Sequence, residues 1–204
     1  MDNIQHARSA RDFLKYEALS ATVGKDNTVL DASVLIGSAV KIGSGNVFYP
    51  GVVIEQIGQS TITIGNDNIF YPGTYMFASS GAISIGNGNE FGVGGCIVRS
   101  NMPDSKIAIG DGGRYSNGVN IMGATQLGSG SQVLGAITVQ SCTLASGAGF
   151  QDSDPDKRAA VLKGFGLARG LTLEVGQVVN GAGDFAKAPI EWQSTYHPKA
   201  EVKT

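Results

Sequence analysis

The chain has 204 residues, which is enough for one sizeable hydrophobic core, or for one domain with an appendage. Its formal net charge is -2 and charged residues make up 16% of the chain, so no basic field exists that would hold nucleic acid or an anionic membrane surface. Glycine is the anomaly, with 30 residues, and together with the Val, Ile and aromatic content it indicates short strands joined by many tight corners.

The N-terminal segment 1–22 carries charges throughout and has no apolar stretch of the kind that a secretory signal needs. No apolar run in the chain approaches the length of about 18 residues that a membrane span requires. Cys96 and Cys142 lie far apart and outside any CxxC motif, so we interpret them as buried thiols, with a single disulfide as the alternative. These features predict a cytoplasmic protein in which residues 1–22 form a cap, with a short helix as its expected form.

The central segment 23–150 is repetitive. A motif of thirteen residues begins at residues 39, 61, 82 and 106, as AVKIGSGNVFYPG, TITIGNDNIFYPG, AISIGNGNEFGVG and KIAIGDGGRYSNG. Apolar residues recur at every sixth position, which fits neither a helix nor an uninterrupted alternating strand. The positions are Leu30, Ile36, Ile42, Phe48 and Ile54, then Ile64, Phe70 and Met76, then Ile85, Phe91 and Ile97, then Ile109, Tyr115, Ile121, Leu127, Val133, Val139 and Ala145. The period predicts triangular coils of about 18 residues that stack in parallel around an apolar interior. At the corners, Asn46, Asn68 and Asn89 share one motif position and predict a structural ladder.

The copies of the motif are separated by more than one coil because short insertions interrupt them. The insertions are EQIGQST (55–61), FASSGA (77–82) and VRSNMPDS (98–105). Since successive coils stack, these loops are expected to project from one corner, where a site would be built; packing against a terminal helix is the alternative. Arg99, Asn101 and Asp104 in the longest insertion are candidates for binding a phosphate or a sugar hydroxyl, and Asn117 and Asn120 are candidates for facing a cleft between subunits. Ordinary surface loops and corner turns explain the same residues.

The C-terminal part begins with DSDPDKRAAVLKGFG (152–166), where Asp154 suits a helix N-cap and Pro155 suits the first helical position. We therefore predict a helical excursion over 151–170, with the helix around 154–164. A final coil is expected over 171–184. The remaining tail, 185–204, is expected to pack on a face of the column or on a neighbouring subunit through Trp192 and Tyr196.

The hexads IGSGNV, IGNDNI and IGNGNE resemble the hexapeptide repeats of left-handed parallel β-helix proteins. The resemblance covers about residues 24–150, with a further coil at 171–183. It implies an all-β, left-handed parallel β-helix of about seven triangular coils, with short helical additions near the N-terminus and around 154–164. It also implies a homotrimer with a small-molecule ligand at the subunit interface.

The function implied by this resemblance is acyl transfer from acetyl-CoA or another acyl-CoA to a sugar or amine. Family acyltransferases generally use a coil histidine as general base, and the related γ-class carbonic anhydrases hold a metal with three coil histidines. This chain has only His6 and His197, both outside the coils. The three-histidine metal site is therefore excluded, no metal is expected, and His197 in the tail is the candidate catalytic base, with a solvated surface histidine as the alternative.

A weaker resemblance supports a different class of function. The chain is similar to the small hexapeptide subunits of dynactin, which are structural components of an assembly. The similarity lies in the IxIGxxNxF motif, in the absence of histidine from the coils and in a tail that contains Tyr-His-Pro-Lys. The alternative to an acyltransferase is therefore a non-catalytic scaffold or binding protein.

Overall fold

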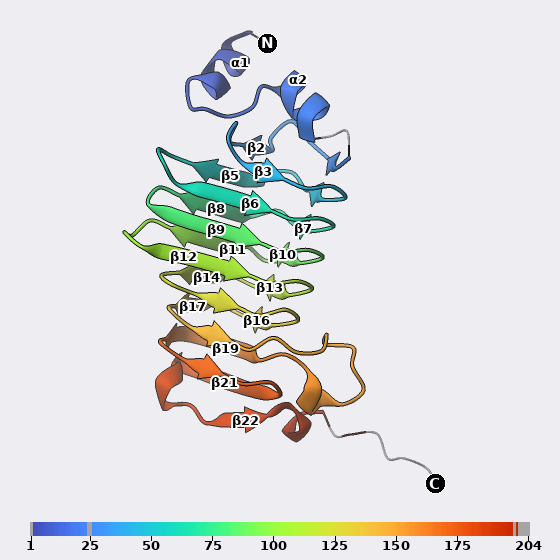
Figure 1. The fold of residues 1–204 in the computed structure, drawn as a ribbon, viewed down its shortest axis with the longest axis vertical. Helices are drawn as coiled ribbons and strands as arrows, with labels where there is room; N and C mark the ends of the chain where they lie inside the picture. The colour runs from blue at the N-terminus through green and yellow to red at the C-terminus, as the bar shows by residue number, and fades with distance from the viewer. Residues whose placement is uncertain (1, 24–25, 198, 200–204) are drawn as a thin grey trace.

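The computed structural model describes residues 2–23, 26–197 and 199 of the chain. These residues form a three-sided column of parallel strands stacked along one axis, with the N-terminal helices at one end and the tail at the other (Figure 1). As the chain descends in Figure 1, one face runs from left to right on the near side and another returns on the far side, which is a left-handed path. The predicted left-handed parallel β-helix is confirmed.

Each face is a ladder of short strands from successive coils. The first face carries β1 (Thr28–Val29), β4 (Val47–Phe48), β7 (Ile69–Phe70), β10 (Glu90–Gly92), β13 (Arg114–Ser116) and β16 (Gln132–Leu134). The second face carries β2 (Leu35–Ile36), β5 (Val53–Gln56), β8 (Thr74–Ala78), β11 (Cys96–Ser100), β14 (Val119–Met122) and β17 (Ile137–Gln140). The third face carries β3 (Lys41–Ile42), β6 (Thr61–Ile64), β9 (Gly81–Ile85), β12 (Ser105–Ile109), β15 (Gln126–Leu127), β18 (Thr143–Leu144) and β20 (Thr172–Leu173).

The last coil is less regular. Strand β19 (Val161–Arg169) turns the corner from the first face to the second, pairing with β16 and then with β17, and so joins the two faces into one sheet. Strand β21 (Gln177–Asp184) follows β19 in parallel, and β22 (Ile190–Trp192) adds to it antiparallel. The column has about five turns, slightly fewer than the seven predicted.

The interior is filled by stacked identical positions, as the six-residue period requires. Phe48, Phe70, Phe91 and Tyr115 stack along the first face with ring centroids 4.9, 5.3 and 5.2 Å apart. Isoleucines fill the third face in two rows, of which Ile62, Ile83 and Ile107 form one and Ile64, Ile85 and Ile109 the other. Burial of these rows is the main stabilising contribution, at about 25 cal/mol for each Å² of apolar surface removed from water.

Three predicted core positions are wrong: Leu30, Ile97 and Ala145. Ile97 points outward, while Cys96 and Val98 on either side of it are fully buried. The cause is one extra residue at the corner 92–95, because Phe91 pairs with Tyr115 and Val98 with Ile121, seven residues apart on one coil and six on the next. Since side chains alternate along a strand, a shift of one residue exchanges the inner and outer rows. Near the two ends of the column, Leu30 is exposed and Ala145 is half-buried. The inward positions there are Val29, the partner of Phe48, and Leu144, the partner of Leu127.

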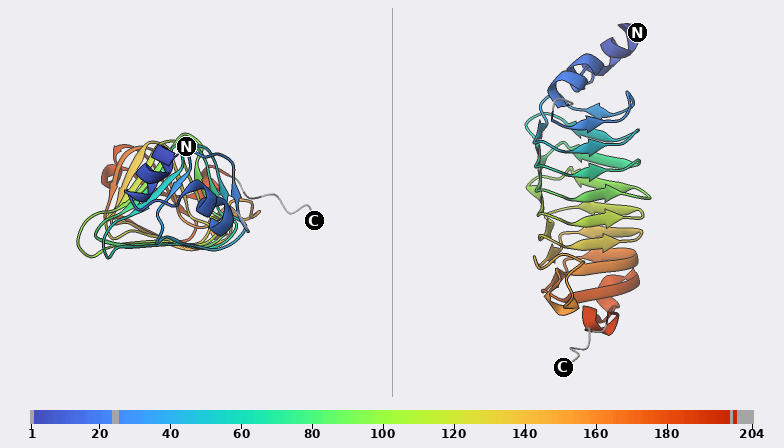
Figure 2. Two further views of the ribbon diagram at one scale, coloured as in Figure 1. Left: turned by 90° about the horizontal axis from the view of Figure 1, so that it is seen from above. Right: turned by 90° about the vertical axis from the view of Figure 1, so that its right-hand side faces the viewer.

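The ends are closed by non-repetitive segments. Helices α1 (Asp2–Ser9) and α2 (Tyr16–Ala18) and the π-helical turn η1 (Leu19–Val23) lie over the first coil (Figure 2). The buried guanidinium of Arg8 fastens this cap by donating to the main-chain carbonyls of Leu14, Ala32 and Val34 at 2.7 to 2.8 Å. No helix of the described residues is long and apolar enough to cross a membrane.

The predicted helix around 154–164 is wrong. Only the 3-10 turn η2 (Pro155–Lys157) forms, with the Asp154 carboxylate accepting from the Asp156 N–H, and β19 follows it. The N-cap at Asp154 is therefore confirmed, but the predicted length of the helix is not. The apolar run 159–162 leads into β19, which pairs with β16 instead of continuing a helix. The tail continues with the 3-10 turns η3 (Phe185–Lys187) and η4 (Gln193–Thr195) on either side of β22.

Candidate functional site

The predicted substrate-binding residues lie in two places. Arg99 on β11 and Asn120 on β14 are neighbours on the outer side of the second face, where Arg99 Nη2 donates to Asn120 Oδ1 at 3.4 Å. Asn101 and Asp104 follow in the insertion between β11 and β12, where both are exposed. Asn117 lies at the corner between the first and second faces, in the left-handed region with φ of 66°. His197 belongs to neither group, because it lies at the C-terminal end of the first face.

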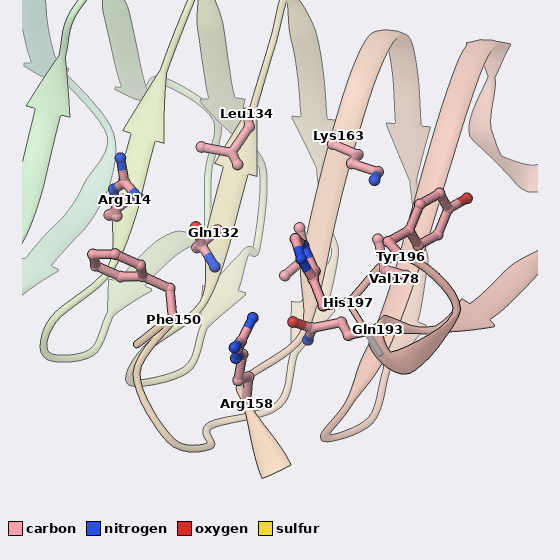
Figure 3. Close-up of a pocket in the computed structure, with 11 residues that line it drawn as sticks. Arg114, Gln132, Leu134, Phe150, Arg158, Lys163, Val178, Gln193, Tyr196 and His197 are labelled. Carbon is pink, nitrogen blue, oxygen red and sulfur yellow. The ribbon is translucent and has the colours of Figure 1, made fainter. Parts of the chain in front are cut away.

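A pocket of about 210 Å³ opens on the outer side of the first face (Figure 3). Its lining residues come from the coils, from the loop before β19 and from the tail, and they are Arg114, Gln132, Leu134, Phe150, Arg158, Val161, Lys163, Val178, Gln193, Tyr196 and His197. Of the candidates predicted from the sequence, only His197 belongs to this pocket.

The floor of the pocket follows from strand register. Arg114, Gln132, Val161 and Val178 are successive partners on β13, β16, β19 and β21, so their side chains form one outward row. The next outward row, two residues further along each strand, supplies Leu134 and Lys163. The row that makes up the floor is apolar in the early coils, with Val47 and Ile69, and becomes charged or polar at Glu90, Arg114 and Gln132. This change of residue type at one repeat position is the sequence signal that could have located the site.

One wall of the pocket is the tail, which Gln193 fastens to the column through both its side chain and its main chain. The buried side-chain amide of Gln193 donates to the Ala159 carbonyl at 2.7 Å, and the Gln193 N–H donates to the Gly176 carbonyl at 2.8 Å. The His197 N–H then donates to the Gln193 carbonyl at 2.9 Å. These bonds place the imidazole of His197 over the outward row of the first face.

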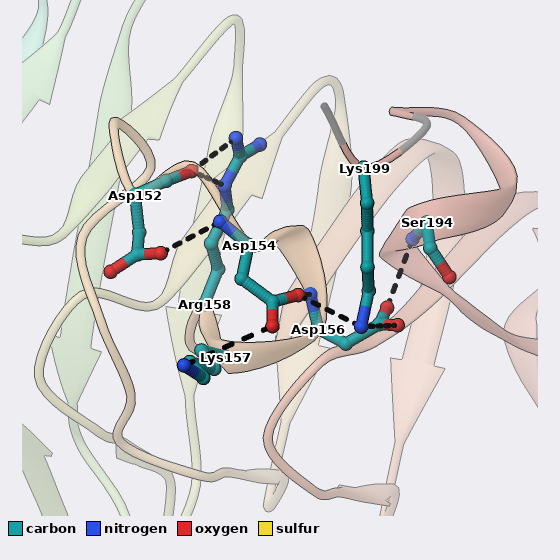
Figure 4. A network of polar contacts seen from close by, with 7 residues as sticks. All are labelled: Asp152, Asp154, Asp156, Lys157, Arg158, Ser194 and Lys199. Carbon is teal, nitrogen blue, oxygen red and sulfur yellow. Dashed lines mark hydrogen bonds and ion pairs between the residues drawn. The ribbon is translucent and has the colours of Figure 1, made fainter. Parts of the chain in front are cut away.

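A polar cluster holds the same wall from outside (Figure 4). Lys199 Nζ lies 3.1 Å from the Asp154 carboxylate and 3.3 Å from that of Asp156, and Asp156 also accepts from the Ser194 N–H at 3.0 Å. The hydrogen bond with Lys199 lowers the pKa of Asp154, and the same contact raises the pKa of Lys199. The tail residues next to His197 are therefore tied to the turn η2.

The opposite wall is the segment before β19, which contains Phe150 and Arg158. Arg158 donates from Nε and Nη2 to the Asp152 carbonyl at 2.9 and 2.6 Å, which fixes its guanidinium at the pocket. Phe150 packs under Arg114, with the guanidinium carbon 4.3 Å from the ring centroid. In the view of Figure 3, His197 lies between the guanidinium of Arg158 and the ammonium of Lys163.

The pocket is basic. Its lining contains two arginines, a lysine and a histidine, and none of the described residues that line it is a carboxylate. Lys163 Nζ lies 3.4 Å from the ring centroid of Tyr196, whose hydroxyl points away from His197 and donates to Glu191. That hydrogen bond raises the pKa of Tyr196. Such a site favours anionic ligands and developing negative charge.

A second hollow of about 190 Å³ adjoins the first and shares Arg114 with it. Its lining contains Tyr71, Glu90, Gly92, Ser116 and the predicted Asn117, among others. Gly92 lies in the outward row that holds Tyr71 one coil earlier, and its φ of 115° is readily adopted by glycine alone. A Cβ at Gly92 would lie 2.7 Å from the Cβ of Tyr71. Together the two hollows form a groove along the first face.

Among the described residues, no group of three or more His, Cys, Asp or Glu side chains is arranged to hold a metal ion.

Comparison with known proteins yields structural likeness only. No family model matches the chain, and no curated protein matches its sequence. Among solved structures, the N-acyltransferase AntD from Bacillus cereus, in complex with dTDP and coenzyme A, is similar over 89% of this chain and 91% of AntD, with 13% identity and a TM-score of 0.50. A second AntD structure, with dTDP and 3-hydroxybutyryl-CoA, gives 13% identity and a TM-score of 0.50 over 90% of each chain. At this identity the likeness establishes the fold, which is the left-handed parallel β-helix.

Proposed function

We propose that the protein is an acyltransferase that moves an acetyl or longer acyl group from acyl-CoA to a sugar or amine acceptor. The pocket of the first face is the active site in this proposal, and His197 is its general base. The observation that carries it is the position of His197, which lines a basic pocket together with Arg158 and Lys163.

The chemistry requires one proton transfer and one exchange of bonds. An imidazole nitrogen of His197 takes the proton from the acceptor N–H or O–H while the acceptor's lone pair attacks the thioester carbonyl carbon. The resulting oxyanion is stabilised by the nearby cations. When the C–S bond breaks, the CoA sulfur leaves with the bonding electron pair and receives the proton from the imidazolium, which restores neutral His197.

The fold supports this choice. AntD, which has the same fold, is an N-acyltransferase observed with coenzyme A and with an acyl-CoA. A column with a basic groove along one face can hold the phosphates of such a donor while its acyl group reaches His197. Acyl-CoA acts here as a cosubstrate.

We further propose that the active form is a cytoplasmic homotrimer with the ligand at the subunit interface. The outer side of the second face presents Tyr75, Phe77, Ile97 and Met122 at exposed or half-buried positions, as a face that packs against a copy would. Arg99 on this face has a buried Nε without a hydrogen-bond partner in the described residues. The free cysteines Cys96 and Cys142 are typical of a reducing compartment.

In the trimer, Arg99, Asn101, Asp104 and Asn120 would complete the site from a neighbouring subunit. On one chain these four lie on the second face and its insertion, away from His197. Asn117, at the corner between the two faces, would contact ligand from either side. The role of these residues is acceptor binding in this proposal.

Release of free thiol from acetyl-CoA in the presence of a panel of amino sugars and amines tests the proposal. We expect His197→Gln to lower kcat by at least about a hundredfold, the lower limit of general-base catalysis. His6→Gln is the matched control, because His6 is the other histidine of the chain and lies on α1. Equal rates for the wild type and His197→Gln would overturn the assignment of the base.

The second candidate is a non-catalytic scaffold or binding protein. It is favoured by one observation, the absence of histidine from every coil. A wild-type protein that releases no thiol with any acceptor, while remaining folded, would favour this function over acyl transfer.

A further inference from the structure

The cations of the pocket are unequally neutralised by their surroundings. Among the described residues Arg114 forms an ion pair, with its Nε 3.6 Å from the Glu90 carboxylate. Arg158 and Lys163 form none within the same residues, although both are half-buried. The uncompensated positive charge is therefore concentrated at the end of the groove that contains Arg158, Lys163 and His197.

The contacts that fix these two side chains leave their charges intact. Arg158 donates to a main-chain carbonyl, that of Asp152, which orients the guanidinium without cancelling it. Lys163 lies against the ring of Tyr196, which is neutral. Two like charges that line one hollow repel each other, and an anion bound in that hollow lowers the cost of this repulsion.

The rest of the lining limits the kind of anion. Leu134, Phe150 and Val161 supply an apolar surface beside the cations. The cavity of about 210 Å³ is smaller than the roughly 300 to 1,000 Å³ of pockets that enclose whole drug-sized ligands. It therefore suits the head group of a larger molecule whose remainder lies along the groove.

We infer that this end of the groove binds a phosphate or diphosphate group of an organic ligand, held mainly by Arg158 and Lys163. The inference concerns the same pocket and rests on the proposed function for its ligand's role. The diphosphate has two possible sources, the CoA donor or an acceptor carried on a nucleoside diphosphate. Arg114, which is paired with Glu90, contributes less to the binding.

Calorimetric titration of the full chain with inorganic pyrophosphate tests the site. We expect Arg158→Gln and Lys163→Gln each to weaken pyrophosphate binding at least about tenfold, the usual worth of a charge-assisted hydrogen bond. Lys157→Gln is the matched control, since it removes the same charge one residue away from Arg158, where Lys157 extends into solvent and pairs with Asp154 at 4.0 Å. This control is expected to stay within about twofold of the wild type, because solvent-exposed charges are strongly screened.

Two further measurements keep the result interpretable. Arg158→Lys keeps the charge and is expected to retain most of the affinity, and thermal unfolding of each variant shows whether it is folded. Absence of pyrophosphate binding by the folded wild type at millimolar concentration would overturn the inference. Equal weakening by Lys157→Gln would overturn it as well, because the effect would then be one of overall charge.

Competition experiments distinguish the source of the diphosphate. Displacement of pyrophosphate by coenzyme A identifies the donor, and displacement by dTDP identifies a nucleotide-linked acceptor; either result supports the inference, and displacement by neither contradicts it. The thiol-release assay separates this inference from the proposed function. Acyl transfer without pyrophosphate binding would leave the proposed function standing and remove this site, whereas pyrophosphate binding without acyl transfer would do the reverse.

Discussion

Replacement of Asn68 by alanine tests how the corners of the column are held together. The Asn68 side chain is fully buried and makes four hydrogen bonds, two donated by Nδ2 to Asn46 Oδ1 and the Gly86 carbonyl, and two accepted from Asn89. Its removal leaves the Asn89 N–H and the Gly86 carbonyl without these partners, at about 1 to 3 kcal/mol for each buried group. We expect the free energy of unfolding to fall by about 3 to 5 kcal/mol, a large part of the roughly 5 to 15 kcal/mol of a typical domain.

A matched control is present two residues earlier in the same corner. Asn66 belongs to a parallel ladder in which it accepts from the Ser44 N–H at 2.8 Å and donates to Asn87 Oδ1 at 3.1 Å, but its side chain is exposed. Water can replace these bonds, so Asn66→Ala is expected to cost no more than about 1 kcal/mol. Urea unfolding of both variants, with the slope of the transition checked for change, gives the comparison. Losses that agree within about 0.5 kcal/mol would show that burial of the ladder is not what makes it stabilising.

Three other changes have defined outcomes. Burial raises the pKa of the Cys96 thiol to about 12, above its unfolded value near 8.5, so the unfolded chain loses this proton at a lower pH than the folded chain. The free energy of unfolding should therefore fall as pH rises from about 8.5 toward 12. Urea titrations at several pH values should show a steeper fall in the wild type than in Cys96→Ser. Arg8→Gln, which loses most of the bonds to three main-chain carbonyls, is expected to speed amide exchange in β2 while leaving β14 protected, and equal protection in β2 would contradict the role of Arg8 as a cap. If each site of the trimer uses His197 of one subunit and Arg99 of another, two inactive variants can complement each other. His197→Gln and Arg99→Ala chains mixed before assembly should recover activity at about one quarter of the sites. No recovery in mixed trimers would mean that both residues belong to a site within one chain, or that Arg99 is not part of the site.

The fold was largely predictable because it is a local repeat. Every coil has the same pattern of inward residues, so a wrong assignment of one residue as inward does not affect the assignment of the other coils. The errors occur where the repeat is broken: the extra corner residue before Cys96 turned Ile97 outward, and the run at 159–162 became a strand because β16 offers an unpaired edge. Neither error can be read from the local residue types. An insertion at a corner and a strand formed by tertiary pairing both override the secondary-structure propensity of the residues involved.

The site was much less predictable, since it is assembled from distant segments. Arg114, Arg158 and Lys163 meet His197 only because β13, β19 and the tail come together at one end of the column. The insertion loops were the predicted place for a site because they depart from the period, yet the basic pocket lies on a face where the period is kept. On the first face only the outward residues change from coil to coil. The six-residue period is defined by the inward residues, so it gives no information about these outward ones.

The internal ladders change at the coil of Arg114, the residue that both hollows of the groove share. The buried asparagine ladder ends at Asn89, whose Oδ1 accepts from the Gly113 N–H, and the space beside Gly113 is occupied by the hydroxyl of Tyr115, which hydrogen-bonds to Ser131 at 3.0 Å. The aromatic stack also ends at Tyr115, since Val133 follows it. The exposed ladder continues through this level, with Asp111 and Ser129 still bonded, so the column does not need the buried ladder to end here. This coil keeps its stacking while it replaces the buried asparagine, one coil after the outward Val or Ile gives way to Glu90. The change therefore has a reason other than folding, and the groove on the outer side of these coils supplies one.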